Sequence, residues 1–213
     1  LTDDARTPLI LFGPVPKGED QMFDEYKHRV ELLVRQQNDM VTRYLIDAKT
    51  KMKSEDPKVR EEGELSLFRA YKGMPKSKAL IKYLSEQGVK VRMQKTEEIY
   101  LQENEKNMHI ATDPLLFVID EKNKTVELTD KGIDTLTGNM EDSHFFVLPD
   151  VGSEIAELEK ENLTEQEKQS RKDAILANYA LKSERVHTVN QLLKAYTLFE
   201  KDVDYIIQNN EVK

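Results

Sequence analysis

The sequence contains no cysteine, no tryptophan and only eight glycines among its 213 residues. Without cysteine, a disulfide framework, a cysteine-based zinc cluster and a thiol nucleophile are excluded. No run of about 18 apolar residues occurs, so no segment is suited to spanning a bilayer, and the first residues lack the layout of a signal peptide. The scarcity of glycine, with many Glu, Lys, Gln and Leu residues, favours helix.

The chain carries a net charge of −8, with 34% charged and 38% hydrophobic residues. Its length is sufficient for a real hydrophobic core. The basic residues are interspersed with acids along the sequence, so we expect no basic stripe and no nucleic-acid partner.

Helical periodicity dominates the first half of the chain. Apolar residues recur at three- and four-residue steps from Glu19 to about Lys53, which predicts a long helix. Asp56-Pro57 predicts the start of a second helix that ends near Gly73, because proline is favoured in a first turn. With two shorter helices after it, this pattern predicts a helical array from Glu19 to Asn107.

The two shorter helices follow closely. Pro75 predicts the start of the first, with Leu80, Ile81 and Leu84 as its buried face and Gly88 as its stop. The second is predicted from Val89 to about Asn104. Its apolar positions are Val91, Ile99 and Leu101.

The pattern changes at Pro114. Leu115–Ile119, a polar turn and Thr125–Leu128 predict a β-hairpin. Thr129 is expected to cap a short helix that runs to Leu136. His144–Asp150 contains another short apolar run and predicts a strand ended by Pro149.

The last third is predicted to be helical again. Val151 to Lys160 predicts a brief helix, and Thr164–Glu167 fits a capping box that opens a long one. Lys182-Ser183 interrupts its apolar stripe, so one helix and two helices with a bend both remain open.

Short apolar runs lie at both ends of the chain. Thr7–Phe12 is closed by Gly13-Pro14, and 203–208 is followed by Asn209-Asn210, so each predicts a strand. Ends of this kind predict that the sequence is part of a longer one. The fold class expected is α+β, predominantly helical.

The residues alone show no catalytic constellation. Gly13 and Gly18 have the spacing of a phosphate-binding loop, but Glu19 and Asp20 follow where Lys and Ser or Thr are needed. The four histidines form no metal-binding pair of the HxxxH kind. They are His28, His109, His144 and His187. Composition and periodicity therefore predict an α+β interaction domain with no metal and no cofactor of its own.

Three segments resemble SecA, the ATP-driven motor of bacterial protein export. DDARTPLILFGP (3–14) is similar to the segment after its acidic Walker B box. FVIDEKNKTVELTDKGI (117–133) resembles the hairpin and helix of its preprotein cross-linking domain. VHTVNQLLKAYTLFEKDVDYIIQNNEV (186–212) resembles the run into its return strand. The order and approximate spacing of the three agree with the family.

The resemblance implies a domain organisation. Residues 1–13 would be the outgoing strand of a two-stranded stem, 14–202 the preprotein cross-linking domain, and 203–213 the return strand with a truncated hairpin. Residues from about 35 to 110 have no counterpart in short versions of the family. They resemble a helical insertion found in SecA from Bacteroidetes.

The resemblance also implies a role. The Walker A, Walker B and arginine-finger motifs are absent from the sequence, so it implies binding without hydrolysis, with ATP and Mg bound elsewhere in the parent protein. The implied partners are unfolded preproteins and the SecYEG channel, and the implied location is cytoplasmic, peripheral to the inner membrane. The preprotein contacts are expected on the stem strands, at Leu9, Ile10, Leu11, Phe12, Tyr205, Ile206 and Ile207.

A second interpretation comes from another class. The helical array alone would suit a scaffold or adaptor that binds a protein partner and has no link to export. A nucleic-acid-binding role ranks third, because the chain is acidic.

Overall fold

The computed structural model describes residues 17–198. Within them the chain is predominantly helical, with a two-stranded antiparallel sheet, so the expected fold class is confirmed. The strands predicted at 7–12 and 203–208 lie outside the described residues.

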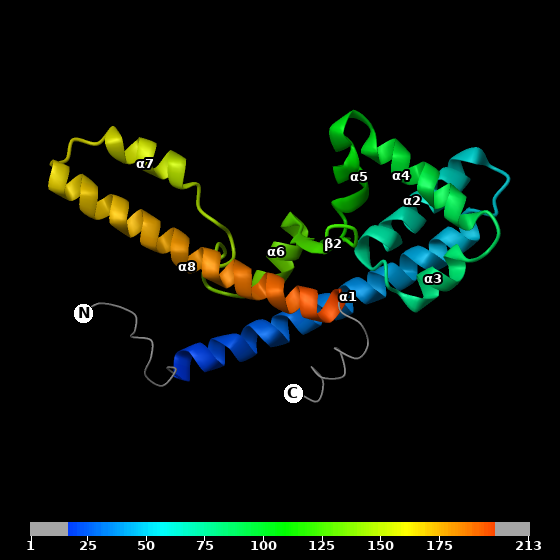
Figure 1. Cartoon of the computed structure of the whole chain (residues 1–213), viewed down its shortest axis with the longest axis horizontal. Coiled ribbons are helices and arrows are strands. Elements are labelled where there is room, and N and C mark those ends of the chain that lie inside the picture. Colours follow the sequence, from blue (N-terminus) through cyan, green and yellow to red (C-terminus); the bar gives the residue numbers. More distant parts are fainter. Residues whose placement is uncertain (1–16, 199–213) are drawn as a thin grey trace.

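One long helix, α1 (Lys17–Lys51), serves as the spine of the structure. Four helices gather around its C-terminal half and form what we call the helical lobe, at the right of Figure 1. They are α2 (Pro57–Gly73), α3 (Lys78–Leu84), α4 (Val89–Glu105) and α5 (Met108–Thr112).

The remaining elements lie along the other half of the spine. The hairpin of β2 (Phe117–Asp120) and β3 (Thr125–Leu128) contacts α2 through β2 and α8 (Glu165–Thr197) through β3, and α6 (Asp130–Thr137) contacts α1. The first half of α8 extends away from α1 with α7 (Val151–Glu159) beside it, as an arm at the left of Figure 1.

Three helices begin where the sequence predicts, each with a side-chain cap. Asp56 accepts a hydrogen bond from the Lys58 amide, Thr129 from the Gly132 amide and Thr164 from the Glu167 amide. The Glu167 carboxylate in turn accepts from the Thr164 amide at 3.1 Å, which completes the predicted capping box. These caps satisfy amides that have no partner inside the helix.

The predicted start of the third helix and one residue of its predicted buried face are wrong. The third helix begins at Lys78 and not at Pro75, because the Ser77 hydroxyl caps it by accepting from the Leu80 amide. Ile81 is 53% exposed, and Tyr83 takes its place on the buried face. On α4 the predicted apolar positions are likewise exposed. The side chains it buries are Val89, Met93 and Thr96.

The strand predicted at His144–Asp150 is absent from the described structure, where these residues form a turn and an irregular segment. Aromatic packing decides this conformation. Tyr26 of α1 meets the rings of Phe145 and Phe146 edge-on, with centroids 6.2 and 5.5 Å apart. The guanidinium of Arg185 lies 3.7 Å from the centre of the Phe145 ring. The apolar run thus anchors the arm to the spine instead of pairing with a strand.

The α8 helix is continuous through Lys182-Ser183, which settles the alternative that the sequence leaves open. Its C-terminal half packs on α1, where Val189 and Leu193 are fully buried. Beside them the Tyr196 hydroxyl donates to the Glu31 carboxylate at 2.9 Å. Burial, with a smaller contribution from Glu31, raises the pKa of Tyr196 above its ordinary value.

A buried glutamine joins the spine to the hairpin. Gln37 is completely buried, and its amide nitrogen donates to the carbonyls of Gly73 and Phe117 at 2.9 and 2.6 Å. Its carbonyl oxygen accepts from the amides of Leu116 and Phe117 at 2.8 and 3.3 Å. Because Gln37 takes the Leu116 amide, β2 begins at Phe117 and not at Leu115 as predicted.

The start of α6 packs on the same segment at very close range. A Cβ atom on Gly132 would lie 1.7 Å from the Leu116 carbonyl oxygen, which no side chain can occupy. The Thr129 hydroxyl donates to the Leu115 carbonyl at 2.6 Å. Gly132 is thus the residue that allows α6 to sit on the hairpin.

Replacing Gln37 with Leu should destabilise the domain by at least about 3 kcal/mol, because several buried backbone groups lose a partner at once. Urea unfolding followed by circular dichroism measures this. Asn38→Ala, one residue away and exposed, should change the unfolding free energy by no more than about 0.5 kcal/mol. Equal effects of the two substitutions would contradict the assigned role of Gln37.

Gly132→Ala should lower the unfolding free energy by roughly 3 kcal/mol or more, as Gln37→Leu does, because the added methyl group forces α6 off the hairpin. Gly152→Ala in α7 is the matched control, since its Cβ would meet no atom closer than 3.5 Å. The control should be neutral or stabilise by up to about 1 kcal/mol, because alanine favours helix. Thermal unfolding of both variants measures the two changes in stability, and equal changes would contradict the role given to Gly132.

Stability should fall above about pH 10 through Tyr196, because the unfolded phenol ionises there while the folded one stays protonated. Its stabilising contribution is complete below that pH and declines as the pH rises. Tyr196→Phe should therefore lose less unfolding free energy than the unaltered chain between about pH 8 and pH 11. If the unfolding free energies of Tyr196→Phe and of the unaltered chain change with pH in parallel, Tyr196 contributes nothing to the pH dependence of stability.

Candidate functional site

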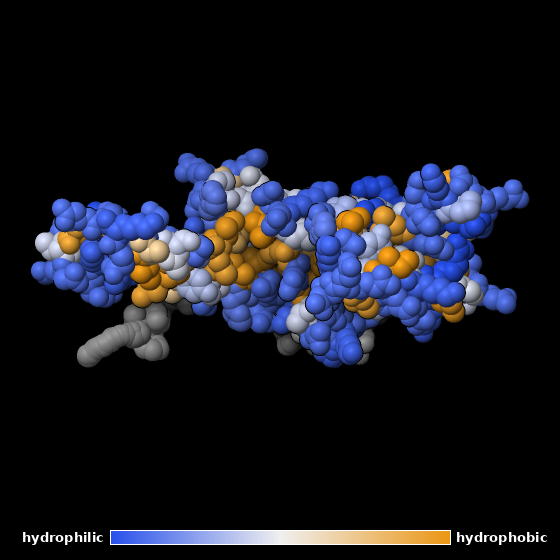
Figure 2. Space-filling view, turned by 90° about the horizontal axis from the view of Figure 1, so that it is seen from above, coloured by the Kyte–Doolittle hydropathy of each residue, from blue (hydrophilic) through white to orange (hydrophobic). Residues whose placement is uncertain are grey.

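The residues predicted to contact preprotein, Leu9–Phe12 and Tyr205–Ile207, lie outside the described residues, so their grouping stays a prediction. Seen from above, the described surface is mostly hydrophilic, with apolar residues gathered in a hollow near its middle (Figure 2). A concave surface runs along α1 where this helix faces α6.

This surface, which we call the α1–α6 groove, consists of two pockets of about 470 and 590 Å³. They share Gln36 and Thr135, so they adjoin end to end. The first is lined by Glu25, His28, Arg29, Leu32, Leu33, Gln36, Thr135, Leu136, Gly138 and Asn139. The second is lined by Gln36, Asp39, Met40, Arg43, Tyr44, Leu116, Lys131 and Thr135.

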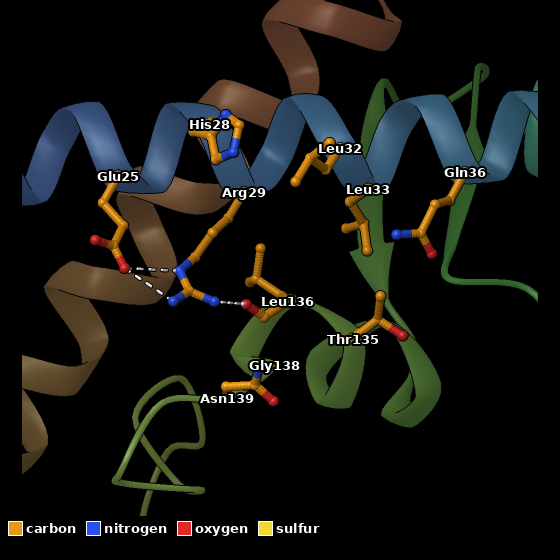
Figure 3. A pocket seen from close by; sticks show the side chains of 10 residues that line it. All are labelled: Glu25, His28, Arg29, Leu32, Leu33, Gln36, Thr135, Leu136, Gly138 and Asn139. Carbon is orange, nitrogen blue, oxygen red and sulfur yellow. Dashed lines mark hydrogen bonds and ion pairs between the residues drawn. The ribbon is translucent and has the colours of Figure 1, made fainter.

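Arg29 fixes one end of the groove, as Figure 3 shows. Its guanidinium donates to the carbonyls of Leu136 and Thr137 at 2.9 and 3.0 Å, and it pairs with Glu25 at 2.8 Å. Those carbonyls belong to the last turn of α6 and have no partner within the helix. Arg29 therefore holds α6 at a fixed position beside α1, and its charge is already engaged.

The groove has the dimensions of an extended peptide. From Glu25 to Tyr44, α1 advances about 28 Å, which equals the length of roughly eight residues of extended chain. Leu32 is 38% exposed and points into the first pocket. The walls contain both polar and apolar side chains, so the groove can hold both kinds of side chain without demanding one sequence.

Sequence reasoning missed this groove. Its two walls lie about 100 residues apart in the chain, and only the fold brings Leu32 and Thr135 together. A weak signal exists in the periodicity of α1, because Leu32 falls beside the buried stripe of Val30 and Leu33 and stays partly exposed.

Within residues 17–198, no group of three or more His, Cys, Asp or Glu side chains is placed to hold a metal ion. Over the same residues, no helix combines the length and apolar character needed to cross a membrane. The groove itself offers hydrogen-bonding groups and apolar surface, which are the means of binding a polypeptide.

The fold and the groove define a predominantly helical α+β domain with a surface long enough for an extended chain. Comparison with known proteins gives its family. The family of the SecA preprotein cross-linking domain matches residues 94–213. The chain belongs to this family.

Curated relatives align with the whole chain. It is 60% identical to the protein translocase subunit SecA of Parabacteroides distasonis over 212 residues and to that of Bacteroides fragilis over 214. Identity to the subunit of Cytophaga hutchinsonii is 49% over 214 residues. In all three cases the alignment covers 100% of this chain and 19% of the relative.

The chain thus spans about a fifth of the length of the curated relatives it matches. The helical lobe is aligned in these relatives, although the family match begins within α4. No solved structure matches the chain.

Proposed function

We propose that this chain binds unfolded preproteins, as the clamp domain of a SecA motor that drives them through the SecYEG channel. The observation that carries this proposal is the match of residues 94–213 to the preprotein cross-linking domain. Relatives named as translocase subunits, similar over the whole chain, support it. Hydrolysis of ATP, with its Mg, would take place in other parts of the parent protein, at the cytoplasmic face of the inner membrane.

The terminal strands would form the first of two preprotein-binding surfaces. Residues 1–13 and 203–213 would pair as a stem, and an extended preprotein would add to a free strand edge by β-augmentation. Each backbone hydrogen bond contributes only about 0.5–1.5 kcal/mol net. A few such bonds hold a chain weakly and without regard to sequence, as a translocase requires. The side chains at this edge would be Leu9, Ile10, Leu11, Phe12, Tyr205, Ile206 and Ile207.

The α1–α6 groove would form the second preprotein-binding surface. Its mixed polar and apolar lining suits substrates of varied sequence, and Arg29 keeps its walls in place. The cross-linking domain would therefore hold a preprotein on both its stem and its body.

Site-specific photo-crosslinking tests both surfaces. A photoreactive residue is placed at Ile10, Tyr205 or Leu32 of the full-length parent, and a preprotein is stalled in translocation. We expect adducts at all three positions. Gln94, exposed on α4, is the matched control position and should give no adduct.

The pattern of adducts separates the surfaces. Adducts at Ile10 and Tyr205 alone would remove the groove from the proposal, and adducts at Leu32 alone would remove the strands. The absence of adducts at all three positions would contradict preprotein binding by this chain.

A further inference from the structure

The two ends of the α1–α6 groove differ in charge. In the first pocket the guanidinium of Arg29 is balanced by the Glu25 carboxylate, 2.8 Å away, so both groups are engaged. The second pocket is lined by two cations, Arg43 and Lys131, and by one acid, Asp39. The charged groups of the second pocket therefore leave one net positive charge, in a chain whose net charge is −8.

The two cations belong to opposite walls at the same end of the groove. Gln36 of α1 and Thr135 of α6, both drawn in Figure 3, line both pockets and mark the point where they meet. Arg43 follows Gln36 by about two turns, so it lies on the same face of α1. Lys131 precedes Thr135 by about one turn and shares its face of α6. The two side chains therefore reach the second pocket from its two sides.

The cations of the second pocket are not neutralised by ion pairs. Across residues 17–198, no ion pair involves Arg43, Lys131 or Asp39. The Lys131 ammonium donates to the Pro114 carbonyl at 3.2 Å, and an ammonium has three N–H donors in all. The phenol of Tyr44 lines the same pocket and adds a neutral donor. This set of donors is suited to a carboxylate.

The second pocket also offers apolar surface beneath these donors. Leu116 is buried and Met40 is half-buried, and both line the pocket. A Glu or Asp side chain carries its carboxylate on a short aliphatic stem. The stem can contact the two apolar residues while the carboxylate reaches Arg43, because a guanidinium binds a carboxylate with two parallel hydrogen bonds.

We propose that Arg43 and Lys131 select segments of unfolded polypeptide that place an acidic side chain in the second pocket. This inference rests on the proposed binding of preprotein in the groove, and it adds a charge preference at one end. A basic side chain is disfavoured there, because it would meet two cations and only one acid. Acids are common in most protein sequences, so the preference sets the register of a bound segment and does not restrict which proteins bind.

A peptide scan with the 213-residue chain tests the inference. The starting peptide has about eight residues, the length that the groove can hold in extended form, with neutral side chains, blocked termini and an uncharged fluorescent label. Each position is replaced in turn by Glu, Gln or Lys, and fluorescence anisotropy measures the Kd. Glu should bind about fivefold more tightly than Gln near one end of the peptide only. Elsewhere Glu should give no gain, because the net charge of −8 repels acids.

A substitution in the second pocket identifies the groups responsible. Arg43→Gln should abolish the preference for Glu and keep the Kd of the Gln peptide within about twofold, because only the charged contact is lost. Arg35→Gln is the matched control, since Arg35 is exposed on the same helix and lines neither pocket. The control should keep the full preference. In the unaltered chain, the preference should shrink when the salt concentration rises from about 0.05 to 0.5 M.

The outcomes separate this inference from the proposed function. Equal binding of the Glu and Gln peptides at every position would overturn the inference, while their binding would still support the groove as a preprotein-binding surface. A preference for Lys, or an equal loss of preference in Arg35→Gln and Arg43→Gln, would also overturn it. Failure of every peptide to bind would contradict polypeptide binding in the groove itself, and the charge preference with it.

Discussion

The structure depends on one buried amide. Gln37 sits in the middle of α1 and connects the end of α2 to the first residues of β2 through both ends of its side chain. Burying a polar group is costly unless each donor and acceptor has a partner, and here every hydrogen bond is made to backbone. Gln37 therefore fixes the position of the hairpin relative to the helical lobe. The close packing of Gly132 on Leu116 then places α6 on the hairpin.

The shape of the α1–α6 groove depends on the same contacts. Leu116 is held by Gln37 and Thr129, and it lines the groove as part of the second pocket. Arg29 then holds the far end of α6 through its last carbonyls. A preprotein in this groove would contact walls positioned by polar contacts to backbone, which do not depend on the preprotein's own sequence.

Much of the fold could be predicted from local signals. The caps at Asp56, Thr129 and Thr164 and the hairpin turn act between near neighbours, so the sequence alone reveals them. The errors arise where distant residues decide. Tyr26 and Arg185 draw Phe145 and Phe146 out of a predicted strand, and packing by Tyr83 leaves Ile81 exposed. For the groove the sequence carries only the weak signal of Leu32 beside the buried stripe of α1, because its two walls meet only in the folded chain.

The central claim is that this domain binds unfolded polypeptide with little regard to sequence. Calorimetric titration of the chain with a reduced, carboxymethylated protein, and with the same protein in its native disulfide-bonded form, tests it most directly. The account predicts binding of the unfolded form and none of the native form, with similar affinity for a second unfolded protein of unrelated sequence. Equal binding of both forms, or binding of neither, would contradict it.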